Sequence, residues 1–248
     1  MSTTTFRTSL KFITVSLIIL QINADAIDKS VKQGLSDILD IKIPGVTVRQ
    51  CSCDEQNQCT EEIKNHVFDC ADTCWSHFEK ITKDPKELKE CVDSKEVVFN
   101  NFVGCIQTNL HACVSDMHGP QIEKHDILKM FDVAEQKIVS QRESILNNPA
   151  VKPVRGIVET TLDFGACVKK CFLKKNQQGF CFDRINCQPL ITEKRATSTL
   201  KRCIKGLDWK KEAASLCDCS VKAGVTQLEK YCPMLRLMSQ SKRSRKNH

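Results

Sequence analysis

Apolar residues recur at helical spacing along most of the chain, beginning with the cysteine-rich stretch 51–78. Within it, one set of positions follows at steps of three or four residues and defines a single helix face: Ile63, Val67, Cys70, Cys74 and Phe78. Thr60 is a suitable N-cap, which predicts a loop up to that residue and a helix over Glu61–Ile81.

Cys70 and Cys74 lie on the same face of this predicted helix. Cβ atoms four positions apart on a helix are roughly 5–6 Å from each other, whereas a disulfide needs about 3.8 Å. The two cysteines are therefore expected to bond to different partners across a helix interface. Cys91 and Cys105, on later predicted helices, are candidates for those partners.

The same periodicity predicts helices before and after this stretch. Apolar residues within 31–39 predict a short amphipathic helix, which the turn signal Ile43-Pro44-Gly45 ends. Asp84-Pro85 opens a helix that runs to Val92, since proline is favoured in a first turn. Ser94 is expected to cap a third helix, whose apolar face extends to Cys113.

A cysteine-free interval follows, over 114–166. Gly119-Pro120 breaks the chain, a helical stripe runs from Ile127 to about Leu146, and Asn147-Asn148-Pro149 ends it. His125-Asp126 is expected to be a surface pair on a helix. The apolar stripe favours a packed helix over a flexible linker.

The remaining helices belong to a second cysteine-rich region. One carries Cys167-x3-Cys171, Asp208 caps another, and Ser220 caps a last one that Pro233 ends. Few runs alternate apolar with polar residues, and the chain holds only nine glycines and one tyrosine. The predicted fold class is therefore all-α.

The first residues have the pattern of a secretory signal peptide. Arg7 and Lys11 precede the apolar run Phe12–Leu20, and Ala24-Asp25-Ala26 resembles a cleavage site. Residues 1–26 are thus expected to be removed, and the run is too short to cross a membrane. The mature chain is predicted to be secreted, without a membrane span.

Sixteen cysteines in an oxidising compartment predict eight disulfides that stabilise the helices. They fall into two blocks of eight, with the pairing left open: Cys51, Cys53, Cys59, Cys70, Cys74, Cys91, Cys105, Cys113, Cys167, Cys171, Cys181, Cys187, Cys203, Cys217, Cys219 and Cys232. The predicted organisation is a lead-in over 27–50, modules over 51–113 and 167–232 around the cysteine-free interval, and a tail over 233–248. The repeated C-x3-C pair suggests a duplicated module, with each block expected to close on itself.

Charge changes this picture only at the end of the chain. The net charge of +7 is compatible with anionic partners, but it does not identify one. The tail contains four cations that could contact an anionic surface or sugar: Lys242, Arg243, Arg245 and Lys246. A solvated end is the alternative, and no nucleic-acid partner is predicted.

The array C-x-C-x5-C-x10-C-x3-C-W in CSCDEQNQCTEEIKNHVFDCADTCW, behind a signal peptide, resembles secreted nematode proteins with a chondroitin proteoglycan 4 domain. The resemblance spans Cys51–Cys232. It implies a non-enzymatic extracellular protein of the matrix or egg-covering type. The chain has no Ser-Gly dipeptide for glycosaminoglycan attachment and no N-glycosylation sequon, so it is not expected to carry such chains itself.

The sequence contains no catalytic or metal-binding motif that would favour an enzyme or a metalloprotein. The chain contains no G-x-S-x-G, H-E-x-x-H or glycine-rich phosphate loop, and no cofactor is predicted. His66, Cys70, Cys74 and His77 share one helix face, but they span about 16 Å, too far to bind one ion. Redox exchange at the C-x-C pairs is less expected than structural disulfides.

Two functional classes remain open. The first is an extracellular structural or interaction protein that contacts protein or polysaccharide. The second is a carrier of lipid or another small hydrophobic molecule, with a cavity lined by Phe99, Phe102, Phe131, Ile138 and Phe164. Ordinary core is the favoured interpretation of the same side chains, since buried aromatic residues usually just pack.

Overall fold

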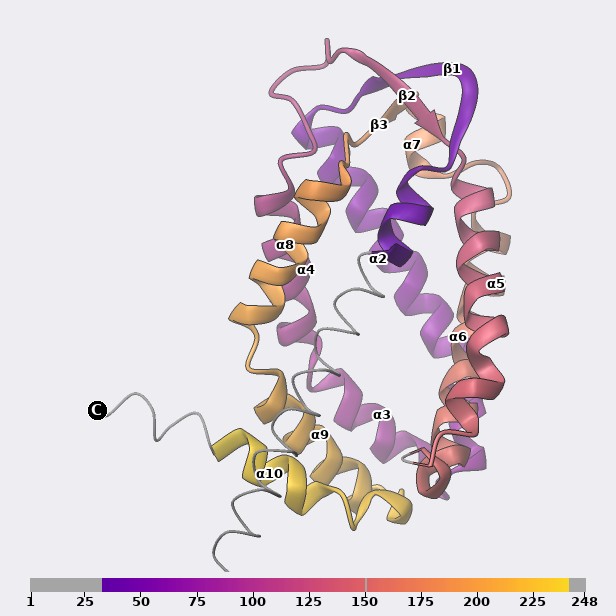
Figure 1. Ribbon diagram of the computed structural model, residues 1–248, viewed down its shortest axis with the longest axis vertical. Helices are drawn as coiled ribbons and strands as arrows, with labels where there is room; N and C mark the ends of the chain where they lie inside the picture. The colour runs from indigo at the N-terminus through magenta and orange to yellow at the C-terminus, as the bar shows by residue number, and fades with distance from the viewer. Residues whose placement is uncertain (1–32, 150, 241–248) are drawn as a thin grey trace, which may run out of the picture.

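The computed structural model describes residues 33–149 and 151–240. Helices dominate it, and a small sheet of three strands lies at one end, so the all-α, disulfide-rich fold class is confirmed (Figure 1). The expected signal peptide and the tail cations Lys242, Arg243, Arg245 and Lys246 lie outside the described residues. Within them, no helix combines the length and apolar character that crossing a bilayer requires.

The elements follow the chain in this order after a helix at 33–39: β1 Lys42–Gln50, α2 Cys53–Cys74, η1 Trp75–Lys80, α3 Pro85–Asp93, α4 Glu96–Leu110, β2 Gln121–His125, α5 Ile127–Leu146, η2 Lys152–Val154, α6 Arg155–Lys175, α7 Cys181–Arg184, β3 Cys187–Gln188, α8 Glu193–Gly206, α9 Trp209–Lys222, η3 Thr226–Leu228 and α10 Cys232–Gln240.

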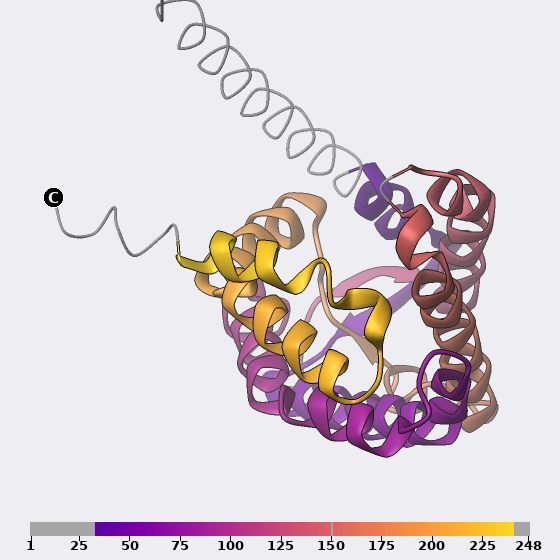
Figure 2. The ribbon, with the colours of Figure 1, turned by 90° about the horizontal axis from the view of Figure 1, so that it is seen from below.

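Below the sheet, the helices pack against one another in pairs. α4 packs against α8, α2 packs against α6, and α5 lies beside α6 on the side opposite α8 (Figure 1). At the end away from the sheet, α9 packs against both α3 and α10. Seen from that end, the helices form a ring with the sheet behind it (Figure 2).

Helix α2 begins eight residues earlier than the Thr60 cap predicts. Ser52 is the N-cap: its hydroxyl accepts from the backbone N–H of Glu55, and the Glu55 carboxylate accepts from the backbone N–H of Ser52. This reciprocal capping box was readable in the sequence as Ser-x-x-Glu. Thr60 lies inside the helix, where its hydroxyl donates to the Gln56 carbonyl at 2.8 Å.

Other predicted helix boundaries had mixed outcomes. Asp84 caps α3, and α5 ends at Leu146, as predicted, whereas the Asp126 cap of α5 was not predicted. Ser94 instead ends α3, where its hydroxyl donates to the Cys91 carbonyl at 2.7 Å. Ser220 is within α9, and Pro233 lies in the first turn of α10 rather than ending a helix, because a first-turn N–H needs no helical partner.

The sheet was not predicted. Its strand order is β2-β1-β3, with β1 antiparallel to β2 and parallel to β3. Between the paired positions Lys42 and Thr47, β1 bulges out, and the predicted turn at Pro44-Gly45 is this bulge, with Gly45 at φ +72°. The sheet thereby joins the lead-in, the cysteine-free interval and the second block.

Six of the eight disulfides link the first cysteine block to the second, so the expectation that each block closes on itself is wrong. The six are Cys51–Cys187, Cys59–Cys181, Cys70–Cys171, Cys74–Cys167, Cys91–Cys219 and Cys105–Cys203. Only Cys53–Cys113 and Cys217–Cys232 stay within one block. The predicted modules 51–113 and 167–232 are therefore not separately cross-linked units.

The buried cores also combine both blocks. In one, Leu88 and Cys91 of α3 pack with Ala223 and Val225, which follow α9. In the other, Cys70 of α2 packs with the buried rings of Phe172 and Phe180. Partly buried Phe131 of α5 completes the second core, with ring centroids 5.8 Å from Phe172 and 6.1 Å from Phe180.

A substitution at Gly119 tests how closely the chain packs on the sheet. An added Cβ there overlaps the backbone carbonyl of Gln50, which cannot move away without disturbing β1. We expect Gly119→Ala to lower the free energy of unfolding by about 1–3 kcal/mol in chemical denaturation. Gly165→Ala is the matched control: it lies in α6 with open space around it, and alanine there is expected to be neutral or stabilising by up to about 1 kcal/mol. Equal midpoints for the two variants would contradict this packing.

Candidate functional site

The predicted site residues are the cysteines, and the structure places all sixteen in disulfides. Cys70 and Cys74 bond to different partners, as predicted. The partners are Cys171 and Cys167 of α6, not Cys91 and Cys105. Each C-x3-C pair is thus bonded to the other one, across two antiparallel helices.

The two C-x-C pairs are likewise divided between distant partners. Cys51 bonds to Cys187 whereas Cys53 bonds to Cys113. A redox-active pair needs two thiols that can bond to each other, and these pairs bridge separate elements instead. The geometry therefore supports a structural role for them.

The candidate metal ligands His66, Cys70, Cys74 and His77 are not brought together as a site. Both cysteines are oxidised, and the His66 ring lies edge-on to Phe172, with centroids 6.3 Å apart. Across residues 33–149 and 151–240, no group of three or more His, Cys, Asp or Glu side chains could hold a metal ion.

His125-Asp126 is not a helix-surface pair. His125 ends β2, and its Nδ1 lies 3.2 Å from the Ile41 carbonyl oxygen. Asp126 caps α5 by accepting from the backbone N–H of Lys129. His125 also lines a pocket of about 260 Å³ beside the sheet, whose other lining residues include Gln188 and Glu193.

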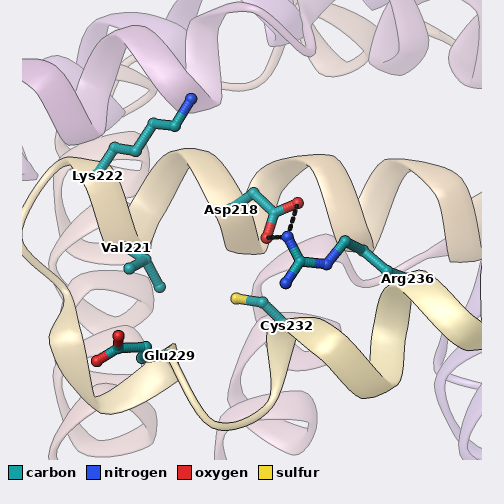
Figure 3. A pocket seen from close by; sticks show the side chains of 6 residues that line it. All are labelled: Asp218, Val221, Lys222, Glu229, Cys232 and Arg236. Atoms are coloured by element: carbon teal, nitrogen blue, oxygen red, sulfur yellow. Dashed lines mark hydrogen bonds and ion pairs between the residues drawn. The ribbon is translucent and has the colours of Figure 1, made fainter.

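A second pocket, of about 310 Å³, lies between α9 and α10 (Figure 3). Arg236 reaches across it and pairs with Asp218 at 3.2 Å, while Lys222 points away from that pair. Cys232 contributes its sulfur, but that atom is bonded to Cys217. The pocket holds two acids and two bases, so it has no net charge, and its sulfur is not a nucleophile.

The five residues proposed for a carrier cavity lie in separate places. Phe131 belongs to the core with Phe172 and Phe180, and Phe164 packs on Trp75 and Phe78.

The other three do not join either cluster. Phe99 meets Phe68 edge-on at the surface, Ile138 is 53% exposed, and Phe102 lines a pocket of about 290 Å³ between α4 and α8. The structure thus does not gather the proposed lining into one cavity.

The most strongly perturbed carboxylate holds β1 to the start of α2. Arg49 donates two hydrogen bonds to Glu55, at 2.7 and 2.9 Å, and both side chains are largely buried. This bidentate contact, helped by hydrogen bonds from Ser52, lowers the pKa of Glu55 from 4.5 to about 2. The pair therefore favours the folded state only while Glu55 is ionised.

A basic surface on α8 is the feature that sequence reasoning missed. Residues 193–212 contain seven lysines and arginines against three acids. Lys194, Lys201 and Lys205 are exposed and recur after seven and eleven residues, close to whole helical turns. This spacing can be recognised in the sequence alone.

We expect Glu55→Gln to destabilise the protein at neutral pH and to have no such effect at about pH 2. The folded pKa of Glu55 is below the unfolded one, so its contribution is complete above pH 4.5 and disappears as the pH falls toward about 2. Allowing for solvent screening, the loss at pH 7 is about 1–2 kcal/mol, or roughly 2–8 °C in Tm.

Thermal unfolding of the unreduced variant across this pH range measures the effect. Glu90→Gln is the control, since Glu90 is an exposed glutamate within α3. A Tm difference between Glu55→Gln and wild type that persists unchanged at pH 2 would contradict the assigned role of the pair.

Comparison of the chain with protein-family models, with curated proteins and with solved structures finds no match. The function is therefore argued from the chain's own residues and their geometry.

Proposed function

We propose that this protein is a secreted, non-enzymatic structural or interaction protein of the extracellular matrix or egg-covering type. The observation that carries the proposal is the set of six disulfides between segments that are distant in the sequence. Such bonds form and persist in oxidising compartments outside the cytosol. They give a fixed framework on which surface side chains keep their positions.

The cysteine spacing supports the proposed matrix or egg-covering type. The array from Cys51 to Trp75 resembles that of nematode proteins with a chondroitin proteoglycan 4 domain. Because the chain has no Ser-Gly dipeptide, the proposed role is to bind matrix components and not to carry glycosaminoglycan chains itself.

The site geometry supports a non-enzymatic role more than a catalytic one. The acids and bases around the α9–α10 pocket include the Asp218–Arg236 pair, and Cys232 has no thiol. A catalytic nucleophile needs an activating base within hydrogen-bond reach. His125 instead binds the backbone of Ile41 through Nδ1, which ties it to the sheet edge.

The alternative of a lipid carrier has less support. A carrier encloses its ligand in one apolar cavity. Phe131 and Phe164 are instead packed in two different aromatic clusters. Phe99 remains 42% exposed, which suits contact with a partner better than enclosure of a ligand.

The proposal predicts that the folded chain is exported and binds extracellular material. The full chain, produced in a eukaryotic secretory host, is expected in the medium without free thiols, and to bind deposited cell-free matrix saturably. The same chain after reduction and alkylation is the control, since it keeps the sequence but loses the disulfide framework.

Loss of binding in the alkylated form, measured by radiolabel or fluorescence, is the expected result. Retention of the folded chain inside the cell, or binding that does not saturate, would overturn the proposal.

A further inference from the structure

The pocket beside the sheet, which His125 lines, is enclosed by three parts of the chain that are far apart in the sequence. Its lining comes from the end of the 33–39 helix and the residues after it, from β2, and from the segment 188–193 that leads from β3 into α8. Ser36 donates to Glu193 at 3.1 Å, so the 33–39 helix lies beside the start of α8 (Figure 1). The volume of about 260 Å³ is slightly below the range of sites for drug-sized molecules, so this sheet pocket suits a small ligand.

Gln188 is a buried polar side chain in the lining of the sheet pocket, only 7% exposed. Its Oε1 accepts from the backbone N–H of His125 at 2.9 Å. Because an N–H can only donate, this contact fixes the amide with its oxygen toward His125 and its Nε2 directed elsewhere. Among the described residues, Nε2 has no hydrogen-bond acceptor. A buried donor without an acceptor costs free energy and is rare in native proteins, so a ligand that supplies the acceptor accounts for it.

The backbone around Gln188 is fixed on both sides. Cys187 is bonded to Cys51, and the Gln188 carbonyl accepts from the Cys51 N–H at 3.1 Å. Further along, the Leu190 N–H donates to the Ala112 carbonyl at 2.8 Å. The Gln188 amide is therefore held in position before any ligand binds, which lowers the entropic cost of binding.

Acids outnumber bases around the sheet pocket. Three carboxylates and one ammonium group line it: Asp40, Glu123, Glu193 and Lys42. Glu123 is paired with Lys42, which lowers the pKa of that carboxyl. Glu193 accepts from a neutral hydroxyl, and within the described chain no cation forms an ion pair with Glu193 or Asp40. Three negative charges against one positive charge favour a cationic ligand, although the whole chain has a net charge of +7.

An organic cation suits this lining better than a metal ion. A metal ion needs several ligating side chains around one point, and residues 33–149 and 151–240 contain no such group of His, Cys, Asp or Glu. Four apolar side chains line the same pocket: Leu39, Ile122, Leu190 and Ile191. Leu39 is only 9% exposed, so hydrocarbon that packs against it is removed from water.

We propose that the sheet pocket binds a small organic amine. Its ammonium group lies against Asp40 and Glu193, its hydrocarbon part packs on the apolar side chains, and an oxygen of the ligand accepts from Nε2 of Gln188. Charge-assisted hydrogen bonds to carboxylates are stronger than neutral ones, and a buried donor discriminates against ligands that lack an acceptor. The site differs from the lipid-carrier alternative, because none of the five residues proposed for that cavity lines this pocket.

Three related probes test the three contacts separately. Tyramine has an ammonium group, an aromatic ring and a phenolic oxygen, whereas phenethylamine lacks the oxygen and 4-ethylphenol lacks the ammonium group. Binding to the unreduced full chain is measured by isothermal titration calorimetry. We expect tyramine to bind saturably with a Kd below about 1 mM, phenethylamine about 3- to 10-fold more weakly, and 4-ethylphenol at least about 10-fold more weakly.

The variant Asp40→Asn/Glu193→Gln tests the contact with the ammonium group. It is expected to raise the Kd of tyramine by about 5- to 30-fold and that of 4-ethylphenol by less than about 3-fold, because only tyramine is charged. The matched control is Glu87→Gln/Glu90→Gln, which removes the same charge from exposed positions of α3, at the end away from the sheet. It is expected to change the Kd of tyramine by less than about 3-fold, since distant charges are screened.

The variant Gln188→Glu tests the buried donor. It keeps an oxygen for the His125 N–H but replaces the Nε2 donor with an acceptor. The added charge acts on both amines alike, so the informative quantity is the ratio of the Kd of phenethylamine to that of tyramine. This ratio is expected to fall to about 1 in the variant. A ratio that stays at the wild-type value would contradict the assigned role of Gln188.

Circular dichroism and a non-reducing intact mass establish that each variant is folded and cross-linked. The proposal is overturned by any of three results: no saturable binding of tyramine up to about 10 mM, equal affinities for tyramine and 4-ethylphenol, or equal effects of the two double variants on tyramine. Export and matrix binding are measured separately, so these results leave the proposed extracellular function unaffected.

Discussion

The fold depends on two disulfides between antiparallel helices. Cys70 and Cys74 of α2 are bonded to Cys171 and Cys167 of α6, with Cα atoms 5.6 and 5.9 Å apart. Each bond closes a loop of about 100 residues, and a single such loop can stabilise a protein by several kcal/mol through loss of unfolded-state entropy. The α2–α6 pair thereby holds the first half of the chain against the second, and further contacts form around this pair.

Packing and charge extend this arrangement beyond the cross-links. Phe172, on the same helix as Cys171, forms a core with Phe131 and Phe180, which brings α5 and the segment before α7 onto the α2–α6 pair. Asp163 of α6 accepts from Lys80 and Arg142, so its pKa is held below the usual value and α6 is tied to η1 and α5.

Local signals predicted the helices better than the tertiary connections. The Asp84-Pro85 helix start and the C-x3-C helix faces are local signals, and the structure confirms them. The Ser52 capping box was equally local and could have been found. The disulfide pairing could not be predicted in this way. Eight cysteines alone allow 105 connectivities, and their spacing in the sequence does not indicate which helices pack together. The sheet was hidden because β1 contains Pro44 and Gly45, which normally indicate a turn.

The central claim is that the chain is one cross-linked unit, in which disulfides join the first cysteine block to the second. Non-reducing peptide mapping after proteolytic cleavage within 114–166 tests it most directly. The account predicts that the two cysteine-rich fragments remain joined in denaturant, release each other only on reduction, and yield peptides linking Cys70 and Cys74 to Cys171 and Cys167. Fragments that separate without a reductant would contradict it.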